Sequence, residues 1–211
     1  MAAGTYDITV TGDPTTNKNY NLTTTKGQLT ITPAALATDG SQNATVSVTG
    51  KVYDGDVNVA PKLTDLTVGL PSELTAPTWT MADFDLSGIT SQNAGDYTIT
   101  LSDAGVAALQ AANQNYTVTR DNVTAGTYTI TPAAVTITAP TVTKAYDGQP
   151  YTLDPTHLVD DNAVTYTWSN ISGDVNVGSY DIEVLTDAGD NQNYTITPVN
   201  GKVTITAAGV T

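Results

Sequence analysis

Gly95-Asp-Tyr-Thr-Ile-Thr100 is a short stretch in which polar and apolar residues alternate behind a glycine. Alternation of this kind is typical of a β-strand that buries one face. The same Gly-x-Tyr pattern leading into a strand begins at Gly4 and again at Gly178. A tyrosine at the start of a late strand is a feature of the tyrosine corner in immunoglobulin-like domains. The stretch therefore predicts an all-β fold that occurs more than once in the chain.

Three other clusters accompany the Gly-x-Tyr strand in a constant order, and such ordered repetition indicates tandem structural units. A Tyr-Asp-Gly cluster precedes the strand in two copies, whereas an Asn-x-Asn-Tyr cluster and a Thr-Ile-Thr strand follow it in all three. We predict the C-terminal half of one repeat at 1–34 and two full repeats at 35–133 and 134–211. The clusters lie at 53–55 and 146–148 (Tyr-Asp-Gly), at 17–20, 113–116 and 191–194 (Asn-x-Asn-Tyr), and at 30–32, 129–131 and 204–206 (Thr-Ile-Thr).

The joint between the two full repeats is short. Thr131-Pro-Ala-Ala-Val135 leads from one closing strand into the next opening strand without a Gly/Ser-rich linker. We therefore expect a fairly stiff, elongated rod. Because Met1 begins in the middle of a repeat, we also expect the chain to be a segment of a longer protein.

Composition and the one helical pattern decide between two all-β architectures. The chain holds 41 threonines, and β-branched residues suit a pleated surface. A helix is predicted over Ser102–Ala112, with a Ser or Asp cap, but only the middle copy has this segment. A β-grasp fold needs its helix to cover the sheet, whereas a sandwich does not. We therefore predict tandem immunoglobulin-like β-sandwich repeats with a short helical insertion in one copy, and keep β-grasp repeats as the alternative.

Two further local patterns make specific structural predictions. Asn200-Gly201 lies between two alternating runs, at 194–199 and 202–206, which predicts a β-hairpin. Trp79 and Trp168 precede the Gly-x-Tyr strand in the two full repeats. We favour a core position for both tryptophans over an exposed platform for stacking on sugars.

The charge of the chain excludes several classes of function. Acidic residues number 21 against seven basic ones, for a net charge of −14, so the clustered cations of a nucleic-acid binder are missing. No apolar run approaches the roughly 18 residues of a membrane helix. The chain has no cysteine and therefore no disulfide framework. We expect no nucleic-acid partner, no membrane insertion and a monomeric chain.

The Tyr-Asp-Gly clusters permit two interpretations. Tyr53 and Tyr146 could stack on a sugar ring while Asp54 and Asp147 accept its hydroxyl groups. The alternative is a tight Asp-Gly turn with the tyrosine packed beside it, which we favour because Asp-Gly is ordinary turn chemistry.

The last Asn-x-Asn-Tyr cluster is rich in oxygen ligands. Asp187, Asp190, Asn191 and Asn193 lie close together in sequence, and calcium takes six to eight such oxygens. The alternative is side-chain-to-backbone bonding in a turn before a strand, which we favour. Calcium is the one metal that these oxygen donors suggest, and no other cofactor is predicted.

Catalytic chemistry has little support in the sequence. His157 is the only histidine, and no cysteine is present for it to activate. The pair Asp160-Asp161 is typical of solvated loop carboxylates. Lys51 and Lys144 precede the two Tyr-Asp-Gly clusters at the same offset, but the closing strands offer no asparagine for a covalent Lys–Asn cross-link, which we do not favour. We therefore predict that the chain is not an enzyme.

The ordered motifs together resemble a known family. Lys-x-Tyr-Asp-Gly, Ala-Gly-Asp-Tyr-Thr-Ile-Thr, Asn-Tyr-Thr-Val-Thr and Thr-Ile-Thr-Pro-Ala are similar to the MBG/YDG-type repeats of bacterial surface adhesins, in particular those of mucus-binding proteins from lactic-acid bacteria. The resemblance implies an extracellular protein, anchored to the cell wall through regions outside this segment. It also implies contact with mucin or another host glycoprotein. The family's motif brings no defined ligand residues.

Overall fold

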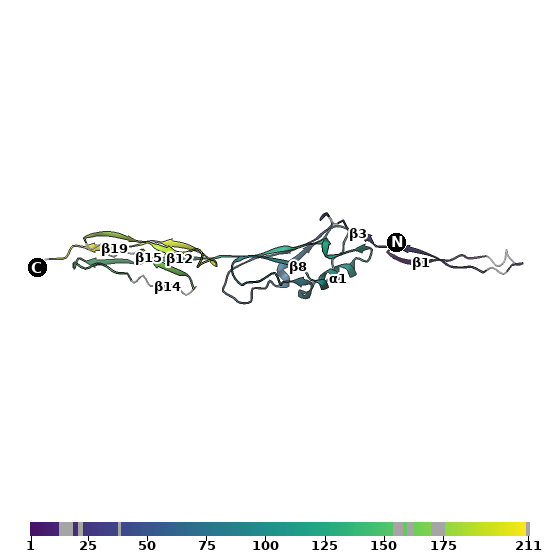
Figure 1. Cartoon of the computed structure of the whole chain (residues 1–211), viewed down its shortest axis with the longest axis horizontal. Helices are drawn as coiled ribbons and strands as arrows, with labels where there is room; N and C mark the ends of the chain where they lie inside the picture. The colour runs from purple at the N-terminus through teal and green to yellow at the C-terminus, as the bar shows by residue number, and fades with distance from the viewer. Residues whose placement is uncertain are drawn as a thin grey trace. The chain divides into compact units, whose positions relative to one another are not determined.

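The computed structural model describes residues 1–12, 19–20, 23–37, 39–153, 158–159, 163–169 and 176–209 (Figure 1). Asn17, His157, Asp160 and Asp161 lie outside the described residues. Contacts divide the chain into two compact units. Unit 1 comprises Met1–Thr49, Ala60–Thr90 and Tyr97–Tyr128, and unit 2 comprises Gly50–Val59, Ser91–Asp96 and Thr129–Thr211.

Unit 1 begins with the antiparallel pair β1 (Gly4–Ile8) and β2 (Gly27–Ile31), in which Tyr6 lies opposite Leu29. The remaining strands pair segments that are distant in sequence. β3 (Ala34–Ala35) runs parallel to β9 (Tyr116–Thr117). β4 (Ala44–Val48) lies between β10 (Val123–Thr124), which is parallel to it, and β6 (Leu66–Gly69), which is antiparallel.

A four-stranded sheet has the order β5-β11-β8-β7. Its strands are β5 (Lys51–Val52), β11 (Gly126–Thr131), β8 (Gly95–Leu101) and β7 (Phe84–Asp85), and residues of β8 and β11 belong to both units. The alternation of polar and apolar residues in β8 is visible in burial, because Tyr97, Ile99 and Leu101 are buried while Asp96 and Thr98 are exposed.

The predicted helix is present as α1 (Asp103–Ala112). Ser102 caps it by accepting the Gly105 N–H at 3.1 Å, as the sequence predicted. Gly105 is buried where the helix meets the short 3-10 turn η2 (Met81–Asp83), and a Cβ there would overlap the Asp83 carbonyl oxygen. Two further 3-10 turns occur in the described part of unit 1, η1 (Leu63–Asp65) and η3 (Arg120–Asn122).

Unit 2 contains the strands of the second full repeat, which form three sheets among the described residues (Figure 1). β12 (Ala133–Thr138) runs parallel to β18 (Tyr194–Val199). β19 (Gly201–Thr206) lies between β13 (Thr141–Ala145), to which it is parallel, and β16 (Gly178–Ile182), to which it is antiparallel. The third sheet has the order β14-β15-β17, with bounds Leu158–Val159, Thr165–Trp168 and Val184–Thr186.

The core of unit 2 draws side chains from more than one sheet, as a sandwich requires. Ile182, Val203 and Ile205 come from the β13-β19-β16 sheet, and Val184 comes from β17 of the β14-β15-β17 sheet. The cluster is completed by Ile137, Ala139 and Val164.

The hairpin predicted at Asn200-Gly201 is wrong. β18 and β19 belong to different sheets, and neither Asn200 nor Gly201 has a positive φ. Instead β12–β13 and β18–β19 run side by side in parallel and change sheets together. Gly201 is needed for this close approach, since a Cβ there would overlap the Pro140 carbonyl oxygen. The Asn-Gly pattern indicates only a local preference for a turn. The parallel pairing of β18 with β12 and of β19 with β13 overrides that preference.

The tyrosine corner is confirmed in two copies. The Tyr6 hydroxyl donates to the Ala2 carbonyl at 2.7 Å, and the Tyr180 hydroxyl donates to the Asn176 carbonyl at 3.0 Å. The helix is present in one copy and absent from the described residues of the other, so it is an insertion. The predicted fold class, all-β repeats with one short helix, is therefore confirmed. The core that unit 2 shares between sheets favours the sandwich over β-grasp.

Candidate functional site

The two Tyr-Asp-Gly clusters form the same turn. Gly55 and Gly148 both have φ of 72°, a left-handed conformation that favours glycine. The carboxylate of Asp54 accepts the N–H two residues further on, from Asp56, at 3.1 Å, and Asp147 does the same with Gln149 at 2.9 Å. This geometry agrees with the turn interpretation of the clusters.

Each turn is held by an ion pair. The Nζ of Lys51 lies 2.8 Å from Asp54, and the Nζ of Lys144 lies 2.8 Å from Asp147. The hydrogen bond from the lysine, followed by the backbone N–H, holds the pKa of each aspartate below its usual value. Both lysines therefore have a role inside the turn, and they are paired with an aspartate instead of the asparagine that a cross-link would need.

The two turns differ in what surrounds the tyrosine. Tyr53 is partly buried and meets the ring of Tyr194 edge-on, with ring centroids 5.5 Å apart. Tyr146 is 43% exposed, and no aromatic ring among the described residues contacts it. Both tyrosine N–H groups extend the pairing with the closing strand, Tyr53 to Thr131 and Tyr146 to Thr206. Binding of a ligand by Tyr53, Asp54, Tyr146 or Asp147 stays a prediction.

The first asparagine of the Asn-x-Asn-Tyr cluster joins two distant backbone segments. Asn191 is 3% exposed; its Oδ1 accepts the Thr165 N–H, and its Nδ2 donates to the carbonyls of Thr165 and Asp187. Asn113 repeats this arrangement in unit 1, with Thr75 and Leu109 as partners. The side-chain amide thus imitates a strand neighbour, as the side-chain-to-backbone interpretation predicted.

The second asparagine joins two copies of the repeat. In unit 1 the Oδ1 of Asn115 accepts the Ala3 N–H at 2.8 Å. In unit 2 the Oδ1 of Asn193 accepts the Ala94 N–H at 2.7 Å, and its Nδ2 donates to Asn93 at 3.0 Å. The residues contacted lie directly before the Gly-x-Tyr strand of the preceding copy. We call this set of contacts, together with the Tyr53–Tyr194 pair, the repeat junction.

Sequence reasoning missed the repeat junction. Its signal was available, because an asparagine stands two residues before the Gly-x-Tyr glycine in both full repeats, at Asn93 and Asn176. The sequence could not show that this asparagine meets the Asn-x-Asn-Tyr cluster of the next copy, since that contact depends on parallel pairing between distant strands.

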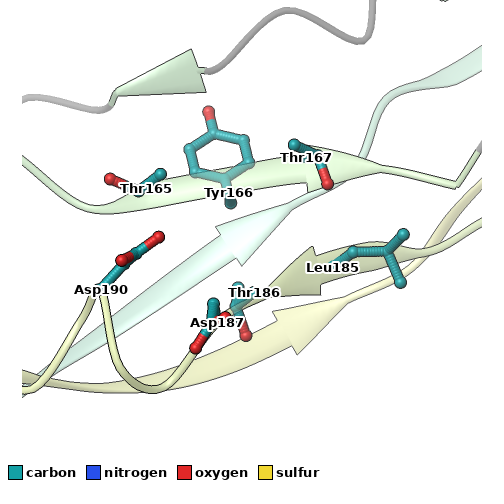
Figure 2. A pocket seen from close by; sticks show the side chains of 7 residues that line it. All are labelled: Thr165, Tyr166, Thr167, Leu185, Thr186, Asp187 and Asp190. Carbon is teal, nitrogen blue, oxygen red and sulfur yellow. The ribbon is translucent and has the colours of Figure 1, made fainter.

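A cavity of about 200 Å³ lies beside the last Asn-x-Asn-Tyr cluster (Figure 2). Asp187 and Asp190 come from the loop between β17 and β18, and Tyr166 comes from β15. Hydroxyl and aliphatic groups complete the wall: Thr165, Thr167, Leu185 and Thr186. Carboxylates, hydroxyls and one aromatic face are groups that can bind a polar ring such as a sugar.

The four predicted calcium ligands do not converge in this structure. Asp187 and Asp190 line the cavity, whereas the amides of Asn191 and Asn193 are held by the backbone and by Asn93. Among the described residues, no group of three or more histidine, cysteine or acidic side chains forms a potential metal site. Calcium binding therefore stays a prediction, with Asp187 and Asp190 as the ligands available to it.

The tryptophans lie against apolar neighbours. Trp168 is partly buried at the end of β15, packs on the core of unit 2 and meets Tyr166 at 5.2 Å between ring centroids. Trp79 is also partly buried and lies 6.0 Å from Phe84, but it belongs to no strand. Packing is thus observed for both residues, although only Trp168 lies on a middle strand.

The fold and the repeated turns define an all-β repeat protein, and comparison with known families identifies its type. The model of the MBG domain family matches residues 40–132 and again 133–209. The two matches cover most of the chain, which therefore belongs to the MBG domain family.

The chain is also similar to the solved structure of a cell surface adhesin from Lactobacillus reuteri, with 31% sequence identity. This similarity covers 44% of the present chain and 99% of the adhesin chain, with a TM-score of 0.37. A search of curated proteins found no match. In the described residues, no helix has both the length and the apolar character needed to cross a membrane.

Proposed function

We propose that the chain is a repeat segment of a bacterial cell-surface adhesin, extracellular and without enzymatic activity. In this proposal the repeats form an elongated stalk that is anchored to the cell wall through regions outside the segment. The stalk adds weak, multivalent binding to mucin or other host glycans. Membership of the MBG domain family and the similarity to an adhesin support this function. The predicted repeat boundaries, at 1–34, 35–133 and 134–211, are part of the proposal.

The observation that carries the stalk role is the repeat junction. The same cluster type bonds to the preceding copy twice, at Ala3 and at Ala94, through an asparagine Oδ1. Each of these bonds joins residues of different copies inside a single compact unit. These duplicated side chains link one copy to the next. A stalk needs such links between its repeats, whereas a catalytic site does not.

The cavity beside Tyr166 is the glycan site in this proposal. One aromatic ring, two carboxylates and several hydroxyl groups line it, so ring stacking and hydrogen bonds to sugar hydroxyls are both available. A single such site in an open cavity binds weakly. Repetition of the segment along a stalk raises the effective concentration and hence the avidity.

Charge makes this proposal testable in a specific way. Mucins carry sialic acid and sulfate, so a segment with net charge −14 is repelled at long range. Binding that depends on stacking and hydrogen bonds should therefore strengthen as salt screens the repulsion, or as calcium bridges Asp187 and Asp190. A binder driven by its own positive charges would show the opposite dependence on salt.

The test is binding of the full chain to a mucin-coated surface, measured at low and at physiological salt, with and without calcium. We expect weak binding that rises with the density of mucin on the surface and falls with Tyr166→Ala. Gln192→Ala, at an exposed residue of the same loop, is the matched control. No binding at high density and millimolar concentration would leave the purely structural spacer, which presents a distal adhesive domain, as the function.

A further inference from the structure

The part of the repeat junction that lies in unit 2 is made from two sets of residues, one on each copy. The first copy presents Tyr53, Asn93 and Ala94. The next copy presents Asn193 and Tyr194, both from its Asn-x-Asn-Tyr cluster. We call the first set the socket and the second set the plug. All five residues belong to unit 2, so the contacts lie within one compact body.

The second full repeat carries the same socket at equivalent positions. Tyr146 stands in a Tyr-Asp-Gly turn with the same glycine φ as that of Tyr53. Asn176 and Val177 precede Gly178 just as Asn93 and Ala94 precede Gly95. The backbone brings these residues to one end of a sheet, since the Tyr146 N–H donates to the Thr206 carbonyl and Gly178 pairs with Ile205.

The socket of the second repeat is exposed. Tyr146 is 43% exposed, Val177 is 58% exposed, and Asn176 is exposed as well. Among the described residues, no acceptor meets the Val177 N–H, and no partner meets the Asn176 amide. In the socket of the first repeat, both of these hydrogen bonds and the ring contact of the tyrosine are made with the plug.

We propose that Tyr146, Asn176 and Val177 form a docking surface for the Asn-x-Asn-Tyr cluster of another repeat of this type. The second asparagine of the incoming cluster accepts the Val177 N–H and donates to the Asn176 side chain, and its tyrosine meets the ring of Tyr146 edge-on. The occupant is set by the chemistry of the socket: one N–H donor, one amide and one aromatic face, which the Asn-x-Asn-Tyr cluster matches without any charge.

A second contact at the existing junctions supports the same occupant. The alanine that follows the closing strand donates its N–H to the backbone carbonyl of the second asparagine, Ala34 to Asn115 and Ala133 to Asn193, each at 2.9 Å. Ala208 follows the closing strand of the second repeat at the same distance in sequence. The sequence Ala208-Gly-Val-Thr211 also matches Ala133-Ala-Val-Thr136, which begins the second repeat. Ala208 therefore stands at the position from which its N–H could donate to the second asparagine of an incoming cluster, as Ala34 and Ala133 do.

The test extends the full chain by one repeat. Residues 137–211 are appended after Thr211, so that Ala208-Gly-Val-Thr211 takes the place of Ala133-Ala-Val-Thr136. Amide hydrogen exchange at Val177 is measured by NMR in the original and the extended chains. We expect the exchange of Val177 to slow by at least about tenfold in the extended chain, as a newly hydrogen-bonded amide does. Ala94 is the internal reference for a plugged socket, and the Val177 of the appended copy is the reference for an open one.

Variants of the plug make the test specific. Asn193→Ala in the appended copy alone should restore fast exchange at Val177, whereas Gln192→Ala in the same copy should not. A second extension, with residues 38–211 appended, places the cluster 113–116 against the socket and should protect Val177 equally. Fast exchange at Val177 in both extended chains, with Ala94 protected, overturns the proposal. Fast exchange at Ala94 in the original chain overturns it as well, because the junction that serves as its template would then be missing.

Discussion

The Tyr-Asp-Gly turns of the two full repeats share a sequence and a geometry but differ in their surroundings. Gly55 and Gly148 have the same φ, and each aspartate has the same lysine partner. Tyr53 is nevertheless covered by Tyr194 whereas Tyr146 is exposed. An exposed tyrosine beside a carboxylate suggests a sugar site when only one copy is considered. The comparison shows that exposure is not a property of the motif, because the same turn has a covered tyrosine in one copy and an exposed one in the other.

The largest expected effect concerns the first asparagine of the last Asn-x-Asn-Tyr cluster. Asn191→Ala removes three hydrogen bonds to the backbone and leaves the N–H and C=O of Thr165 without these partners. We expect the free energy of unfolding of unit 2 to fall by about 2–4 kcal/mol. The measurement is urea denaturation followed through Trp168 fluorescence, with Gln192→Ala as the control. A loss below about 0.5 kcal/mol would contradict the structural role of this amide.

The second prediction tests the comparison of the tyrosines directly. Tyr53→Ala removes a partly buried ring that contacts Tyr194, and we expect it to destabilise unit 2 by about 1–2 kcal/mol. Tyr146→Ala removes an exposed ring and should cost less than about 0.5 kcal/mol. Thermal or urea unfolding of the two variants measures the difference. Equal losses at the two positions would mean that the contact with Tyr194 contributes nothing.

The third prediction compares the two Tyr-Asp-Gly turns by the free energy of unfolding that is lost when the glycine of each is replaced. Gly55→Ala and Gly148→Ala place a Cβ in open space, so the cost comes only from the left-handed backbone. We expect each substitution to destabilise the chain by about 1 kcal/mol, with no difference between the two. A clear inequality, measured by urea unfolding, would show that the surroundings alter the turn itself.

The smallest effect is the titration of the turn aspartates. Hydrogen bonds from the lysines lower the pKa of Asp54 and Asp147 in the folded chain, so their stabilisation is present above the ordinary aspartate value of about 3.9. It is lost as the pH falls through the lower folded values. Carboxyl NMR should show both residues titrating below the ordinary value. Lys144→Met should move the pKa of Asp147 back toward that value and leave Asp54 unchanged, and an unmoved Asp147 would refute the ion pair.

The sequence predicted well what depends on nearby residues. The Ser102 cap, the Asp-Gly turns and the tyrosine corner at Tyr180 each involve groups within a few residues of one another. Short-range hydrogen bonds follow from residue type and spacing, so the motifs were sufficient to predict them.

The sequence failed where distant strands decide the structure. Asn200-Gly201 was predicted to close a hairpin, but the chain changes sheets there because β18 and β19 pair with β12 and β13. The partners of Asn193 were missed for the same reason, since Asn93 and Ala94 are about one hundred residues away in the chain. Contacts between residues so far apart in the chain depend on the whole fold, so a local sequence pattern cannot predict them.

The central claim is that the Tyr-Asp-Gly cluster of one repeat joins the Asn-x-Asn-Tyr cluster of the next. A double-mutant cycle on Tyr53 and Tyr194 tests it most directly, through urea unfolding of the two single variants and the double variant. We predict a coupling energy of about 0.5–1.5 kcal/mol, as for other edge-to-face aromatic pairs. The control cycle on Tyr146 and Tyr194 should be additive within about 0.3–0.5 kcal/mol. Additivity of Tyr53 with Tyr194 would contradict the junction and return both turns to the status of possible ligand sites.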